Sequence, residues 1–90
     1  MDAMSFGMLL KRKGVKLYKE VDGRSIAEIL GFISEETQKK LANTELSHEL
    51  IEELLMDSMK SSGIKNTDSE IRARLNDADY MERLKSKYTG

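Results

Sequence analysis

The stretch that decides the fold runs from Ser47 to Gly63 and reads SHELIEELLMDSMKSSG. Its apolar residues recur at the three- and four-residue spacing of a helix, and the pattern extends back to Leu46. On an ideal helical wheel these residues cover an arc of about 220°, which is wider than one neighbouring helix can bury. We therefore predict a helix from about Thr44 or Ser47 to Ser62 at the centre of the core, contacted on more than one side.

Shorter helices on both sides of this segment are predicted by their start and stop signals. Ser25 and Thr67 are each followed three residues later by a glutamate, which is the spacing of a capping box, and Ser34 is followed by two acids. Gly14 and Gly63 fit helix ends closed by a glycine in the left-handed conformation. The helices expected from these signals cover residues 2–13, Ser25 to about Gly31, Ser34 to about Ala42, and Thr67 or Asp68 onwards.

Two segments leave alternatives open. Residues 15–21 alternate between apolar and polar, which predicts an extended connector or a marginal strand, and the Asp22–Gly23 turn signal allows a hairpin. In the last helix the apolar residues form two stripes displaced by roughly 120°, far more than the drift of about 20° per heptad. Either that helix breaks at residues 76–79, or its end packs against something different from its start.

Together these signals predict an all-α fold, a small bundle of four to five helices formed by residues 1–90 as one domain. The chain has no cysteine, which excludes a disulfide framework and thiolate metal sites and fits a reducing compartment such as the cytoplasm. The apolar run at residues 8–10 is too short for a secretory leader, and no stretch is apolar enough to span a membrane.

Charge is distributed unevenly along the chain. Residues 1–24 hold six basic and three acidic side chains, residues 25–57 hold two and eight, and residues 58–90 hold seven and five. This order favours attraction between segments of the chain, or one charged face for a partner. The basic segment 11–19, with Tyr18 among its cations, is a candidate for contact with phosphate groups. The cations concerned are Lys11, Arg12, Lys13, Lys16 and Lys19.

Catalysis is not indicated. His48 is the only histidine, so an imidazole-based metal site is excluded, and no nucleophile motif or phosphate-binding loop occurs. The acid pairs at 35–36 and 52–53 are adjacent on their helices, so their carboxylates point about 100° apart rather than face each other. We expect no enzyme activity, no cofactor and no metal.

Residues 25–41 resemble a bacterial helix-turn-helix, in which a small residue pairs with a glycine four residues later. Ala27 and Gly31 fit that pair, and the resemblance implies a DNA-binding regulator whose recognition helix starts after Ser34. The segment departs from the motif at Thr37, where a buried Val or Ile is usual. It also opens the second helix with acids, which repel phosphates.

The favoured function is a helical protein–protein interaction module of the adaptor, assembly or regulatory kind. Its partner is predicted to be another protein or a second copy of the chain, with nucleic acid as the alternative and no membrane. Apolar residues that lie off the main core stripe are the best interface candidates. They are Phe32, Met56, Tyr80, Met81, Leu84 and Tyr88.

Overall fold

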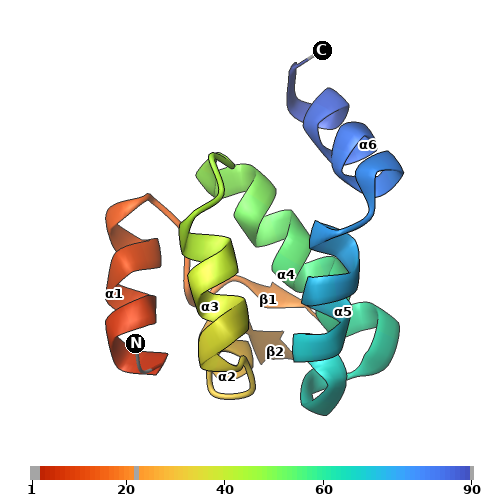
Figure 1. Cartoon of the computed structure of the whole chain (residues 1–90). Coiled ribbons are helices and arrows are strands. Elements are labelled where there is room, and N and C mark those ends of the chain that lie inside the picture. The colour runs from red at the N-terminus through yellow and green to blue at the C-terminus, as the bar shows by residue number, and fades with distance from the viewer. Residues whose placement is uncertain (1–2, 22, 90) are drawn as a thin grey trace.

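The protein has an all-α fold, as the sequence predicts (Figure 1). The computed structural model describes residues 3–21 and 23–89, and the side chains of residues 5–20 and 23–87. These ranges form α1 (Ala3–Arg12), β1 (Glu20–Val21), β2 (Arg24–Ser25), α2 (Ile26–Leu30), α3 (Glu35–Ala42), α4 (His48–Ser62), the 3-10 helix η1 (Ile64–Asn66), α5 (Thr67–Leu75) and α6 (Ala78–Thr89). The described ranges therefore hold one α-helix more than the four to five expected, because the C-terminal segment forms two helices.

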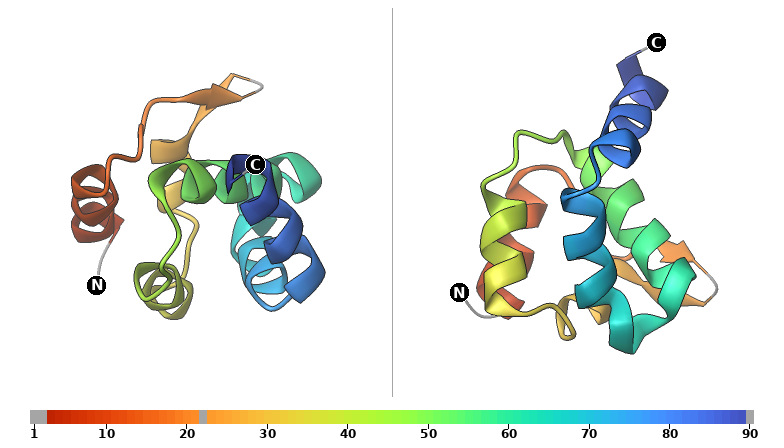
Figure 2. Two further views of the ribbon diagram at one scale, coloured as in Figure 1. Left: turned by 90° about the horizontal axis from the view of Figure 1, so that it is seen from above. Right: turned by 45° about the vertical axis from the view of Figure 1, so that its right-hand side comes forward.

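Helix α4 occupies the centre, as predicted. Seen from above, α3 and α5 lie on one side of α4 and the β1–β2 hairpin lies on the other (Figure 2). Helices α2, α5 and α6 all contact α4. Beyond α5, α6 extends away from the rest of the chain towards the C-terminus (Figure 1).

The apolar face of α4 is buried, and it is wider than the sequence indicates. The predicted core residues are at most 7% exposed: Leu46, Leu50, Ile51, Leu54, Leu55 and Met59. Met56 and Ser58 are buried as well. The hairpin lies near this part of α4, since Arg24 of β2 borders a small hollow together with Met59 and Lys60.

Two helices begin at the predicted serine caps. The Ser25 hydroxyl accepts a hydrogen bond from the Glu28 N–H (3.4 Å), and the Ser34 hydroxyl accepts one from the Thr37 N–H (3.3 Å). The capping box predicted at Thr67 is wrong. Thr67 continues a helical run that η1 begins, and its hydroxyl donates to a backbone carbonyl four residues earlier (3.0 Å).

A glycine turn closes α1 and directs the chain towards α4. Gly14 has φ of 96°, and the N–H of the next residue, Val15, donates to the Leu10 carbonyl (3.0 Å). A Cβ at Gly14 would lie in contact with α4, 3.4 Å from Cγ of His48, so the positive φ is what favours glycine here. Gly63 has the predicted positive φ, 79°, but its ψ of 168° is extended rather than left-handed helical.

The segment predicted as a connector or marginal strand is divided. Residues 15–19 form turns and irregular backbone, and we call them the connector. Residues 20–21 form β1, which pairs antiparallel with β2 so that Glu20 lies opposite Ser25. The hairpin that the sequence left open is therefore formed, with strands only two residues long.

The C-terminal segment breaks within the predicted range 76–79. The Asn76 N–H still donates to the Arg72 carbonyl (3.2 Å), but the helix does not continue. Asp77 then caps α6, because its Oδ1 accepts a hydrogen bond from the Tyr80 N–H (3.1 Å). The break explains the two stripes, because α5 and α6 are separate helices and their apolar residues need not follow one helical register.

A hydrogen-bonded carboxylate joins α5 to the start of α3. Asp68 Oδ1 accepts a hydrogen bond from the Ser34 N–H (2.8 Å), and Arg72 lies 3.3 Å from the other carboxylate oxygen. Burial raises the pKa of Asp68, but hydrogen bonds from Ser34 and Thr37 and the charge of Arg72 outweigh burial and leave that pKa below its usual value. The ionised form of Asp68 therefore stabilises the fold.

Asp68→Asn is expected to lower the free energy of unfolding by about 1 kcal/mol at pH 7. A carboxylate whose folded-state pKa is depressed contributes stability above its unfolded pKa of about 3.9, and this contribution is lost as pH falls through the folded value. Wild-type stability should thus fall more steeply below about pH 4 than that of the variant. Urea denaturation at several pH values measures both slopes. Glu45→Gln, at an exposed carboxylate, is the control, and parallel curves for wild type and Asp68→Asn would contradict the assignment.

Candidate functional site

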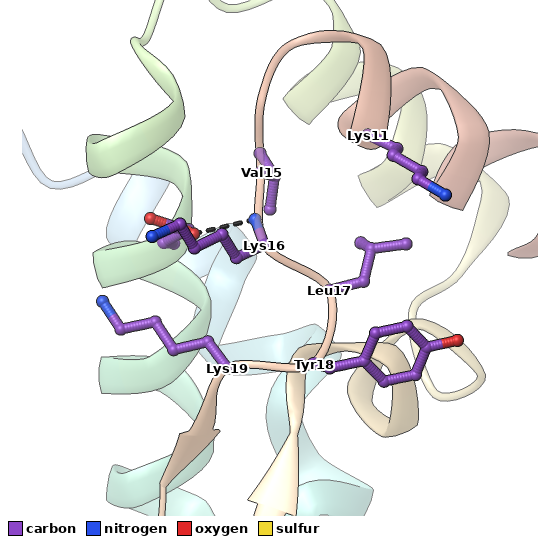
Figure 3. A pocket seen from close by; sticks show the side chains of 7 residues that line it. Lys11, Val15, Lys16, Leu17, Tyr18 and Lys19 are labelled. Carbon is purple, nitrogen blue, oxygen red and sulfur yellow. Dashed lines mark hydrogen bonds between the residues drawn. The ribbon is translucent and has the colours of Figure 1, made fainter.

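A hollow of about 590 Å³ lies where the connector passes between α1 and α4 (Figure 3). It is lined by the connector residues 15–19, by Lys11 of α1 and by Glu52 of α4, and we call it the connector hollow. Its volume falls in the range of about 300–1,000 Å³ found for ligand sites. Size alone therefore permits a small ligand or a few side chains of a partner.

The backbone of the connector is held by three neighbouring elements. The Val15 N–H donates to a carbonyl near the end of α1 (3.0 Å). The Lys16 N–H donates to Oε1 of Glu52 on α4 (2.8 Å), and the Leu17 carbonyl accepts from the Ala27 N–H of α2 (2.7 Å). The side chains that line the hollow therefore leave from a fixed backbone, although this segment has no regular secondary structure.

Glu52 is the residue of α4 that binds the connector. It belongs to the acid pair 52–53, and it is only 5% exposed. Its carboxylate accepts the hydrogen bond from Lys16 across 36 residues of sequence. A buried carboxylate that lost this donor would be left with an unmet desolvation cost, so the bond holds the connector against α4.

Side chains leave the connector on two sides (Figure 3). Leu17 and Tyr18 lie on the side where Lys11 extends from α1, and Lys16 and Lys19 point the other way, over α4. Tyr18 is 82% exposed, and Leu17 is half-buried. One side of the connector thus presents an apolar and an aromatic side chain next to Lys11, and the other side presents two lysines. Such a surface suits a ligand that carries an apolar group beside an anionic one.

The structure brings together three of the five cations predicted as phosphate contacts. Lys11, Lys16 and Lys19 line the connector hollow. Arg12 is exposed but does not line it, and Lys13 is half-buried. The candidate cationic surface is therefore smaller than the basic run in the sequence.

The predicted interface residues do not form one surface. Phe32 follows the end of α2 and is 44% exposed, which confirms its predicted exposure. The prediction that Met56 is exposed is wrong, because it is buried with only 5% of its surface accessible. Met56 lies one helical turn after Glu52, on the side of α4 that the connector and the hairpin cover.

The C-terminal interface candidates mostly join α6 to the rest of the protein. Leu84 is 4% exposed and belongs to the core, so of the two alternatives for this stripe, burial against its own chain holds at Leu84. Tyr80 and Met81 are half-buried and pack against the same core. The side chain of Tyr88 lies outside the described residues.

Tyr80 connects three helices through its ring and hydroxyl. The hydroxyl donates to Oδ2 of Asp57 on α4 (2.7 Å), and the guanidinium of Arg74 on α5 lies 5.4 Å from the ring centroid. Burial and the neighbouring Asp57 carboxylate raise the pKa of Tyr80, and Arg74 offsets this only in part. Tyr80 therefore stays neutral and donates a hydrogen bond where α4, α5 and α6 meet. This makes it a poor candidate for a free contact surface.

His48 and the helix-turn-helix-like segment give little support for other chemistry. His48 Nε2 lies 3.1 Å from Oε1 of Glu49, and its ring packs beside the Gly14 turn. In the helix-turn-helix-like residues 25–41, α2 has only five residues, and α3 begins with the exposed acids Glu35 and Glu36. Phosphates would meet like charge at the start of α3.

Two residues near the hollow were not singled out by the sequence. Met8 of α1 is 56% exposed and lies three residues before Lys11, so both share one face of the helix. A helix can bury only part of the apolar run 8–10, which is a signal that could have found Met8. Glu52 had no such signal, because its partner Lys16 belongs to a distant segment.

Further comparisons add no site. Among the described residues, no cluster of three or more His, Cys, Asp or Glu side chains is placed to hold a metal ion. None of the described helices has the length and apolar character needed to cross a bilayer. Comparisons with protein-family models, curated proteins and solved structures found no significant match to this chain.

Proposed function

We propose that this protein is a non-catalytic protein–protein interaction module that binds its partner at the connector hollow. The observation that carries the proposal is Tyr18, a large aromatic side chain that is 82% exposed on a backbone fixed by three elements. Tyrosine is enriched at protein interfaces and among the residues that dominate binding energy. A fixed backbone also reduces the entropy that is lost when a partner binds.

The surroundings of Tyr18 support the same assignment. Leu17 beside it is half-buried, and Met8 adds exposed apolar area on α1. Exposed apolar side chains with charged residues around them are typical of contact sites. The proposed partner is another protein or a second copy of the chain. A chain without cysteine fits this role in a reducing compartment such as the cytoplasm.

A photo-crosslinking experiment tests the proposal in the native host. A photoreactive benzoyl-phenylalanine replaces Tyr18 in one variant and Phe32 in a second, because Phe32 is the other exposed aromatic among the described side chains and does not line the hollow. We expect protease-sensitive adducts of defined mass from position 18 and few from position 32. The adduct should disappear when Lys16→Glu and Lys19→Glu are added, and the captured protein, once purified, should bind the unmodified chain.

The outcomes separate the possible partners. An adduct of twice the mass of the chain identifies a second copy, and a heavier one identifies another protein. Equal adducts from both positions, or adducts from position 32 alone, would overturn the assignment to the hollow. The absence of adducts from both positions would overturn the proposed function itself.

A nucleic-acid-binding regulator is the second candidate, and one observation favours it. Three lysines line the same hollow as an exposed tyrosine ring, which resembles the pairing of cations and stacking platforms in single-strand binding proteins. The chain as a whole has a net charge of −1, whereas nucleic-acid-binding domains are usually strongly basic. Adducts from position 18 that nuclease removes would favour this candidate over a protein partner.

A further inference from the structure

The charged residues that line the connector hollow differ in exposure, and this difference indicates the charge of its partner. Of its charged lining residues, Lys11, Lys16 and Lys19 are exposed, whereas the single carboxylate, Glu52, is buried against a backbone N–H. The surface that a partner meets is therefore cationic, although the chain as a whole is slightly acidic. An incoming partner with carboxylates would find complementary charge here, and a basic partner would be repelled.

The geometry adds an apolar requirement. Leu17 and Tyr18 lie on one side of the connector, and Lys16 and Lys19 lie on the other (Figure 3). In an extended peptide, side chains two residues apart point in the same direction, about 6.6 Å apart along the chain. A peptide crossing the connector can thus place an apolar side chain near Tyr18 and, two residues away, an acidic one near the two lysines.

We propose that the connector hollow binds a short acidic segment of another protein, in which a large apolar residue is flanked by carboxylates. This inference rests on the proposed function and names the chemistry of the partner. The volume of about 590 Å³ accommodates one large side chain with its neighbours. Each exposed lysine adds little alone, so the apolar contact with Tyr18 carries most of the affinity and the lysines give selectivity for acidic sequences.

A protein segment fits these observations better than a nucleic acid does. The hollow offers a single aromatic ring, whereas strands bound without sequence preference stack successive bases on several rings. Its cations are lysines, and no arginine lines it to stack on bases or hold phosphates in a bidentate manner. The side of the connector with Tyr18 also has a half-buried leucine, which suits an aliphatic or aromatic side chain.

The test is selection from a phage-displayed library of random peptides on the full-length chain. A parallel selection uses the triple variant Lys16→Ala, Tyr18→Ala, Lys19→Ala. The matched control is Phe32→Ala, Lys39→Ala, Lys40→Ala, which also removes one exposed aromatic and two exposed lysines but lies away from the hollow. Denaturation curves of all three proteins confirm that each is folded before selection.

We expect wild type and the Phe32 control to enrich peptides with Asp or Glu beside Leu, Ile, Phe or Tyr. The Tyr18 triple variant should not enrich them. For a fluorescein-labelled consensus peptide, fluorescence anisotropy should show about 30- to 100-fold weaker binding to Tyr18→Ala. Binding to Lys16→Ala with Lys19→Ala should weaken about 2- to 30-fold, and this difference should shrink as salt is raised.

Three results would overturn the inference. They are selected peptides without acidic enrichment, enrichment of the same peptides by the Tyr18 triple variant, and tighter binding of wild type to labelled oligothymidine than to the consensus peptide. If protein adducts at position 18 persist in the crosslinking experiment, the proposed function stands and only the partner chemistry is wrong. If both experiments are negative, the proposed function fails as well.

Discussion

Leu54→Ala is expected to lower the free energy of unfolding by about 2–5 kcal/mol, the range for truncating a buried leucine. Leu54 is 0% exposed and lies in α4, which α2, α5 and α6 all contact, so the cavity would lie where three helices meet. A domain of this size has a total stability of about 5–13 kcal/mol, at roughly 0.05–0.15 kcal/mol per residue. The variant would therefore lose a large part of its stability. Urea denaturation measures the loss.

Two further variants make this result specific to the core. Leu50→Ala should destabilise in the same direction, with a smaller effect because Leu50 keeps 7% of its surface exposed. Met8→Ala, at a side chain that is 56% exposed, should change the free energy by no more than about 0.5 kcal/mol. An unchanged urea midpoint for Leu54→Ala would show that α4 is not central to stability.

The sequence predicted the elements whose signals are local. Ser25 and Ser34 cap their helices through hydrogen bonds to an N–H three residues later, and Gly14 takes the positive φ expected at a helix end. The central helix was predicted because its apolar spacing is sustained along its whole length. In these cases the residues that interact are close in sequence, so the pattern contains the whole interaction.

The miss at Met56 involves contacts between distant segments, whereas the miss at Thr67 involves the helix start just before it. Met56 has acids around it on α4 and looked exposed, but the connector and hairpin, which lie far earlier in the chain, cover that side. Thr67 had the spacing of a capping box, but η1 already started the helix before it. On α3, Thr37 is buried where Asp68 of α5 accepts hydrogen bonds from Thr37 and Ser34. No local pattern shows such partners.

The candidate site was predicted only as a run of charges. The sequence indicated that cations and Tyr18 lie close together at residues 11–19, and three of those cations do line one hollow with it. It did not indicate which side each lysine takes, because the connector is irregular and has no fixed period. It also missed Glu52, whose bond to the Lys16 N–H fixes the shape of the hollow.

Leu84→Ser is expected to release α6 from the rest of the protein. Leu84 is 4% exposed, and it is the only α6 side chain in the described part of the chain that is fully within the core. Replacing it with serine removes its apolar burial and introduces a hydroxyl, at a cost of about 2–5 kcal/mol. Tyr80 and Lys87 also bind α4, through Asp57 and Glu53, but these contacts are polar and partly exposed.

The expected signature is local as well as global. Amide hydrogen exchange in residues 78–89 should accelerate more than exchange in α4, because α6 extends from the body and opens without exposing the central core (Figure 1). Glu82→Ala, at an exposed position of the same helix, should change neither exchange nor the urea midpoint. Adding Met81→Ser should increase the effect, since Met81 packs on the same core. If this double variant instead stays fully folded and only loses self-association or partner binding, the C-terminal stripe is an interface and its assignment to the core is wrong.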